Sequence, residues 1–227
     1  MTAASANLNQ VEMVEIKSDN ISEMEKSYRI NLINSLLGYK SLNLLGTASY
    51  DGITNLCIIS SAFHLGASPP LLGMVIRPQR AHNDTLCNIR ATGQYTLNNV
   101  LPAWYKQAHQ TSASYPSGES EFRTCGFRPQ YINGFKAPFV AESNIKIGLE
   151  LRELIDMEIN GTTIVIGEVI QLLIDNGLVG EEGIIDHIKA ETLTVSGLDA
   201  YFLAHPVGRL SYAKPGIMPY ELGSLKL

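Results

Sequence analysis

The chain has 227 residues, which suits one substantial domain or two small ones. A chain of this length buries roughly 70% of its unfolded surface on folding, so it needs no disulfides or structural metals. Hydrophobic residues make up 45% and charged residues 17%, and 17 basic against 22 acidic side chains give a formal net charge of −5. This acidity argues against a protein whose main work is to neutralise the phosphates of nucleic acid or of a membrane surface.

We expect no export signal, because residues 1–20 have neither a basic n-region nor an apolar h-region. The longest charge-free run, Gly52–Ile76, contains Pro69-Pro70 and so cannot form one apolar helix across a membrane. The chain has three cysteines and no CxxC pair, which fits a reducing compartment. We therefore expect a cytoplasmic protein with neither a membrane nor a nucleic-acid partner.

Small polar residues fill positions 1–20, and we expect an arm there, disordered or packed on a partner, ahead of a single domain over 21–227. Apolar spacing predicts a helix over 22–37. Ser22 and Glu25 match a capping box at its start, and Gly38 matches a C-terminal cap.

The pair Asp51-Gly52 lies between two apolar runs, 42–50 and 53–63, and predicts a hairpin. A third strand follows over 71–76, then a short helix from about His82 to Ala91, and a fourth strand over 95–99. A helical turn is expected over Trp104–His109.

Asn160-Gly161 predicts a second, longer hairpin from runs 145–159 and 162–174, and short strands are expected at 193–195 and 201–203. Hairpins outnumber strand–helix–strand crossovers, which disfavours a doubly wound parallel sheet. The sequence therefore predicts a mainly β protein, a β-barrel with appended helices.

The common catalytic signatures are absent: the sequence has no GxGxxG, no GxxxxGK[ST], no GxSxG and no HExxH. Its five histidines show no metal-ligand spacing. We expect no metal site and no catalytic triad.

One segment is suited to an anion. Arg77 and Arg80 precede a predicted helix, and Thr85 adds a hydroxyl in its first turn, where free N–H groups attract phosphate. Residues 41–140 carry seven basic and four acidic side chains, whereas 141–200 carry three and twelve, so the negative charge lies elsewhere. The alternative is a solvated turn in which Asn83 or Asp84 caps the helix.

The strand before it, Asn55–Phe63, is uncharged and rich in hydroxyls. Adjacent residues of a strand point to opposite faces, so either Ser60 or Ser61 is able to face a ligand ring. The alternative is an ordinary half-buried strand whose hydroxyls bond to their neighbours.

The order and spacing of several segments resemble the flavin reductase-like, FMN-binding split-barrel family, over about residues 30–215. These segments are Asn55–Phe63, Ser68–Gly73 with Arg77, Thr85–Ile89, Thr92–Asn98, Ser120–Phe122, Ala137–Ser143 and Arg209–Pro215.

The resemblance implies an antiparallel split β-barrel of Greek-key type, a homodimer, and FMN in a groove near the subunit interface. The implied contacts to the flavin ring are Asn55, Ser60, Ser61 and Ala62, and those to the phosphate are Arg77, His82 and Thr85. FMN itself carries the hydride chemistry, with NADH or NADPH as donor, so no catalytic side chain is required.

Two other functions fit the same features: a non-enzymatic FMN-binding electron carrier or flavin store, and an oxidase related to pyridoxamine-phosphate oxidation. The oxidase needs extra cations for a phosphorylated substrate, and Lys106, Arg123 and Arg128 offer weak support. Residues Trp104–His109, with Lys106 and His109 among them, either shape the substrate side or simply pack on the barrel.

Overall fold

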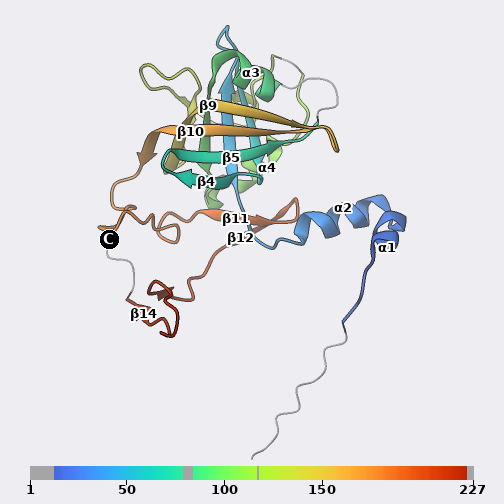
Figure 1. Ribbon diagram of the computed structural model, residues 1–227. Coiled ribbons are helices and arrows are strands. Elements are labelled where there is room, and N and C mark those ends of the chain that lie inside the picture. The colour runs from blue at the N-terminus through green and yellow to red at the C-terminus, as the bar shows by residue number, and fades with distance from the viewer. Residues whose placement is uncertain (1–12, 79–83, 117, 224–227) are drawn as a thin grey trace, which may run out of the picture.

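Antiparallel strands dominate the computed structural model, which describes residues 13–78, 84–116 and 118–223. Seven strands form one sheet in the order β3-β2-β6-β9-β10-β5-β4 (Figure 1). These are β2 (Asn43–Ala48), β3 (Thr54–Ile59), β4 (Phe63–Ala67), β5 (Pro70–Ile76), β6 (Gln94–Asn99), β9 (Ile145–Met157) and β10 (Thr162–Ile174).

The remaining elements flank this sheet. A second sheet has the order β1 (Lys40–Ser41), β11 (Leu193–Ser196) and β12 (Ala200–Leu203). Two short pairs join β7 (Pro129–Gln130) to β8 (Phe139–Val140) and β13 (Arg209–Leu210) to β14 (Glu221–Leu222). The helices are α1 (Ser18–Glu23), α2 (Lys26–Ser35), α3 (Asp84–Thr92), α4 (Tyr105–Gln110) and α5 (Glu121–Thr124), with a 3-10 turn at Pro102–Trp104. None of the helices in the described ranges is long and apolar enough to cross a membrane.

The main sheet has to curl because of how its two outer strands are connected. β3 and β4 lie at opposite ends of the strand order, and a flat sheet of seven strands would hold them about 29 Å apart. Only residues 60–62 join them, and four residue steps from Ile59 to Phe63 reach at most about 14 Å. The sheet therefore closes into a barrel, and the mainly β prediction with appended helices is confirmed.

Alternate residues of β3 face two hydrophobic cores. Leu56 lies in an outer core, where α4, α5 and β11 pack on the sheet. Its neighbour Cys57 packs against a second core to which β2, β5, β6, β9 and β10 all contribute, and which is therefore the barrel interior. Ile89 of α3 belongs to the same inner core, so α3 covers one end of the barrel.

The N-terminal helical region differs from the single helix expected over 22–37. α1 ends at Glu23, Met24 has extended backbone (φ −59°, ψ 146°), and α2 begins at Lys26. The predicted capping box is wrong: Glu25 is itself the N-cap of α2, and its carboxylate accepts from the Ser27 and Tyr28 N–H groups. Capping a new helix there stabilises a break that apolar spacing alone does not reveal.

The run 53–63, expected as one strand, is also divided. β3 stops at Ile59, and Phe63 begins β4, which pairs with β5. Sequence reasoning also missed α5. The hairpins at Asp51-Gly52 and Asn160-Gly161 are confirmed, with β2 pairing β3 and β9 pairing β10.

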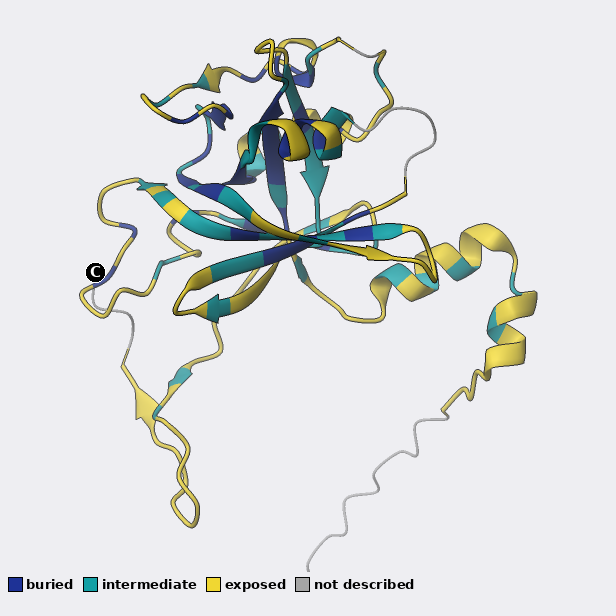
Figure 2. Cartoon of the chain, turned by 45° about the horizontal axis from the view of Figure 1, so that its top comes forward, coloured by how far each residue is buried: buried dark blue, intermediate teal, exposed yellow. Residues whose placement is uncertain are grey.

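Two segments extend away from the barrel, the α1–α2 region and the C-terminal stretch that contains β13 and β14 (Figure 1). Both are almost entirely exposed in Figure 2, and neither α1 nor α2 has a buried residue. α1 starts inside the range 1–20 that the sequence analysis treated as an arm; residues 1–12 lie outside the described part.

Candidate functional site

The three residues that close the barrel, Ser60, Ser61 and Ala62, form a seam between β3 and β4, and neighbouring strands hold it from both sides. The Ser61 hydroxyl donates to the Val75 carbonyl at 2.8 Å and accepts from the Val75 N–H at 3.3 Å. The Ser41 hydroxyl donates to the Ala62 carbonyl at 2.8 Å. Ser60 is half-buried, and within the described part of the chain its hydroxyl has no hydrogen-bond partner. The seam is thus fixed while one hydroxyl stays available.

Asn55 connects β3 to the start of α3. Its Nδ2 donates to the Thr85 Oγ1 at 2.9 Å and more weakly to the Thr47 Oγ1 at 3.4 Å. Thr85 is buried in the first turn of α3, with 6% of its surface exposed. Asn88, one turn along α3, donates to the same Thr47 hydroxyl at 3.1 Å. The strand and the helix start, which the sequence analysis considered separately, are therefore in direct contact.

Arg77 follows β5 immediately and is exposed. Its Nη2 donates to the Asn34 Oδ1 of α2 at 2.8 Å, and it forms no ion pair with any described residue. Arg77 lies two residues after Val75, which holds the seam, so the end of β5 that carries Arg77 adjoins Ser60–Ala62. His82 and Arg80 lie outside the described residues.

A buried carboxylate supports β3 from the other side, and sequence reasoning gave it no role of its own. The Glu121 Oε2 accepts from the Leu56 N–H at 2.9 Å, and 8% of Glu121 is exposed. Burial raises the pKa of Glu121, and the nearby Asp84 carboxylate adds to the effect. The one sequence signal was an acidic residue beside Phe122 in a polar loop. Glu121 satisfies an N–H group on the outer strand of the sheet, where no further strand follows β3.

Cys57, the residue after Leu56 in β3, has a thiol that lies beside Thr85 of α3. Its Sγ lies 3.6 Å from the Thr85 Oγ1, and burial raises its pKa to about 11. At neutral pH the thiol is therefore protonated and unsuited to nucleophilic chemistry. The described residues include no group of three or more His, Cys, Asp and Glu side chains able to hold a metal ion.

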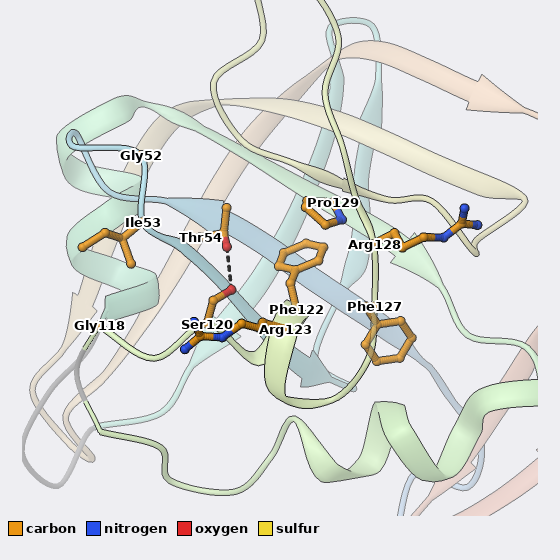
Figure 3. Close-up of a pocket in the computed structure, with 10 residues that line it drawn as sticks. All are labelled: Gly52, Ile53, Thr54, Gly118, Ser120, Phe122, Arg123, Phe127, Arg128 and Pro129. Atoms are coloured by element: carbon orange, nitrogen blue, oxygen red, sulfur yellow. Dashed lines mark hydrogen bonds between the residues drawn. The ribbon is translucent and has the colours of Figure 1, made fainter.

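An open cavity of about 460 Å³ lies on the opposite face of β3. Thr54 faces it, with its Oγ1 2.5 Å from the Ser120 Oγ, and Arg123 lies beside Ser120 (Figure 3). Arg128 also lines the cavity, but its guanidinium extends away from Ser120 in Figure 3 and binds the Glu142 carboxylate, with Nε to Oε1 at 2.9 Å.

The segment Trp104–His109, covering the 3-10 turn's end and most of α4, packs on the outer core. Trp104 meets Phe127 edge to face with ring centroids 5.2 Å apart, and the His109 Nδ1 lies 2.5 Å from the Tyr201 hydroxyl oxygen. The Lys106 Nζ lies 6.0 Å from the Tyr105 ring centroid and does not line the cavity beside Arg123. These contacts favour the packing interpretation of the segment.

The seam and its surroundings fit a flavin nucleotide. The seam and β3 form an uncharged wall with the Ser60 hydroxyl, which has no hydrogen-bond partner among the described residues, and such a wall suits a flat heteroaromatic ring. Arg77 supplies an exposed cation without a carboxylate partner among the described residues, which suits a phosphate. The Thr85 Oγ1 accepts from Asn55, and its hydroxyl proton is the part suited to a phosphate oxygen.

Comparisons with known proteins give the family and the fold of the chain. The family model of the flavin reductase like domain matches residues 38–192, more than half of the chain. A crystal structure from Shewanella frigidimarina NCIMB 400, of a split-barrel protein named as a flavin reductase, is 46% identical in sequence and has a TM-score of 0.85. The match covers 88% of this chain and 100% of that one.

Two more distant structures share the fold. The FMN-binding protein of Thermus thermophilus, crystallised with 1-cyclohex-2-enone, is 18% identical with a TM-score of 0.62, covering 74% of this chain and 88% of that one. The NADH:FAD oxidoreductase SgcE6 of Streptomyces globisporus C-1027 is 14% identical with a TM-score of 0.62, covering 86% and 99%. The expected resemblance and the split-barrel fold are confirmed.

Proposed function

The chain belongs to the flavin reductase-like domain family, and we propose that this flavin-linked oxidoreductase binds FMN and reduces it with a hydride from NADH or NADPH. One observation carries the proposal. Ser61 bonds to the Val75 backbone, two residues before Arg77, so the uncharged seam lies beside the end of β5 that carries an exposed cation. That pairing of an uncharged wall with a cation suits a flavin that ends in a phosphate.

Each residue has a role in this proposal. Asn55, Ser60, Ser61 and Ala62 bind and orient the ring, with Ser60 as the free hydrogen-bonding group. Arg77, His82 and Thr85 hold the phosphate end. FMN supplies the hydride-accepting ring, and no side chain has to move a proton for the hydride to transfer.

The relatives support the cofactor and the donor. The Thermus thermophilus structure is named for FMN binding, and SgcE6 is named for NADH and FAD. FMN has a single terminal phosphate, which matches one exposed arginine beside a helix start better than a larger dinucleotide does.

The test is the flavin spectrum and reduction kinetics of the purified protein. We expect bound FMN, with its visible absorbance, and anaerobic bleaching by NADH or NADPH on a catalytic timescale. A protein that holds FMN but is not bleached by either nucleotide would instead be the electron carrier or flavin store. A protein with no affinity for FMN refutes both.

The proposed phosphate site is tested with a double variant in which alanine replaces both Arg77 and Thr85. Each lost hydrogen bond to the charged phosphate costs roughly 1.5–3 kcal/mol of binding free energy. Arg90→Ala is the control, because Arg90 is exposed near the other end of α3 and pairs only loosely with Asp156, at 3.7 Å. Equal FMN affinity in the double variant and the parent would show that the phosphate binds elsewhere.

We also propose a homodimer in a reducing, cytoplasmic compartment. Apolar side chains stand exposed on and after α2, among them Tyr28 (59%), Leu36 (64%) and Leu37 (87%), and a second copy of the chain would cover them. All three cysteines are free. Sedimentation of an FMN-loaded sample should give a dimer, and a stable loaded monomer would refute it.

A further inference from the structure

Two cationic side chains, Lys40 and Arg77, bond to a single residue of α2. Of the two, only Arg77 belongs to the phosphate site proposed above. The carbonyl oxygen of Asn34 accepts from the Lys40 Nζ at 3.2 Å, while its side-chain Oδ1 accepts from the Arg77 Nη2 at 2.8 Å. Lys40 and Arg77 thus stand on the two oxygens of one residue, although 36 positions separate them in the sequence. Burial and the neighbouring Arg77 charge both lower the pKa of Lys40.

The orientation of Asn34 is fixed by a third contact. Its Nδ2 donates to the Ile30 carbonyl at 2.8 Å, so Oδ1 is the atom left to face Arg77. Lys40 is held as well, since its Nζ also donates to the Gly197 carbonyl at 2.8 Å. The pair is therefore preorganised by neutral oxygens.

No carboxylate of the described residues forms an ion pair with Lys40 or Arg77. Two neighbouring like charges repel each other, and hydrogen bonds to neutral carbonyls offset this only in part. A phosphate monoester carries a charge of about −1.5 to −2 at pH 7, which would neutralise the pair. Arginine binds such a group as a two-pronged donor and lysine binds it as a point charge.

The position of Lys40 places this pair at the proposed flavin site. Ser41, the next residue, holds the Ala62 carbonyl of the seam at 2.8 Å. Arg77 reaches the same seam through Val75 and Ser61. Both residues therefore adjoin backbone contacts of the seam, Lys40 next to Ser41 on β1 and Arg77 two residues after Val75 at the end of β5.

We propose that Lys40 and Arg77 together bind the phosphate of the flavin nucleotide, and that Asn34 is the residue that positions both. This inference rests on the proposed function, because it presupposes that a flavin occupies the seam. It adds a lysine from β1 and a residue of α2 to a phosphate site that sequence reasoning assembled from Arg77, Arg80, His82 and Thr85. The α2 helix is then a part of the cofactor site.

The test compares FMN with riboflavin, which has the same ring and no phosphate. Dissociation constants for both flavins are measured by fluorescence on the full chain and on the Lys40→Met, Lys40→Arg and Asn34→Ala variants. Lys26→Met is the matched control, since Lys26 is exposed on the first turn of α2. Inorganic phosphate should compete with FMN and not with riboflavin.

We expect Lys40→Met to weaken FMN binding roughly 10- to 100-fold and to leave riboflavin binding within about 2-fold. Lys40→Arg should retain most of the preference for FMN, and Asn34→Ala should lose part of it. Lys26→Met should change neither flavin. Riboflavin binding also reports that each variant is folded.

Three outcomes would overturn the inference. Equal losses for FMN and riboflavin would mean that Lys40 acts only by holding α2 on the sheet. Unchanged FMN binding would place the phosphate away from Lys40. Wild-type protein that binds neither flavin refutes the proposed function itself, and protein that binds both equally refutes only the phosphate pair.

Discussion

Replacing Glu121 tests how the wall of the site is supported. The change Glu121→Ala removes the carboxylate oxygen that accepts from the Leu56 N–H, while Leu56 itself has no exposed surface. A buried N–H group without a partner costs about 1–3 kcal/mol. Glu121→Gln keeps an acceptor oxygen at the same place and serves as the matched control.

The pH dependence separates the two variants further. Because burial raises the pKa of Glu121 above its ordinary value of 4.5, the folded protein binds its proton more tightly than the unfolded chain does. This contribution to stability is complete below pH 4.5 and is lost as the pH rises through the raised pKa of the folded state. The wild type should therefore lose stability relative to Glu121→Gln over that window, with a constant difference above it.

Urea denaturation at a series of pH values from about 4 to 8 measures both effects. At pH 7 we expect Glu121→Ala to lose about 1–3 kcal/mol, with Glu121→Gln within about 1 kcal/mol of the wild type. Equal losses in both variants would show that the carboxylate oxygen is not what satisfies the Leu56 N–H. A difference between wild type and Glu121→Gln that does not change with pH would refute the burial argument.

Two further predictions concern packing and thiol access. Gly46→Ala should cost about 1–3 kcal/mol in urea denaturation, since its new Cβ would lie 2.5 Å from the Pro138 carbonyl oxygen. Gly208→Ala, with no atom within 4 Å of its Cβ, should change stability by less than about 0.5 kcal/mol, and a similar loss in both would contradict the steric reason. Iodoacetamide should alkylate the exposed Cys87 in the native protein well before Cys57, whose buried thiol has a pKa of about 11. If mass spectrometry finds Cys57 modified as fast as Cys87, the packing between β3 and α3 does not shield the Cys57 thiol from solvent.

Local chemistry explains the elements that were predicted well. Asp51-Gly52 and Asn160-Gly161 favour tight turns whatever surrounds them, and the alternation of the flanking runs then determines which faces are buried. The N-terminal region was predicted less well, because its apolar spacing continues across Met24 and Glu25. The break there depends on one carboxylate capping the next helix, which competes with helix continuation.

The candidate site, too, was predicted from the sequence only in part. The sequence by itself identified an uncharged, hydroxyl-rich strand, a cation before a helix start, and a spacing of segments that resembles one family. Three contacts of the site join distant chain segments: Asn55 with Thr85, Leu56 with Glu121, and Asn34 with Arg77 lie 30, 65 and 43 positions apart. Nothing in the local pattern of any one of these segments predicts its partner.

Barrel closure is the physical reason for this division. Strand identity follows from turn residues and side-chain alternation, which act over a few positions and can be read from the sequence. The seam exists only because Ser60–Ala62 must join two strands at opposite ends of a seven-strand order, and that order is a property of the whole sheet. The sequence alone thus predicted which residues would suit a flavin, and the tertiary structure decided which of them stand together.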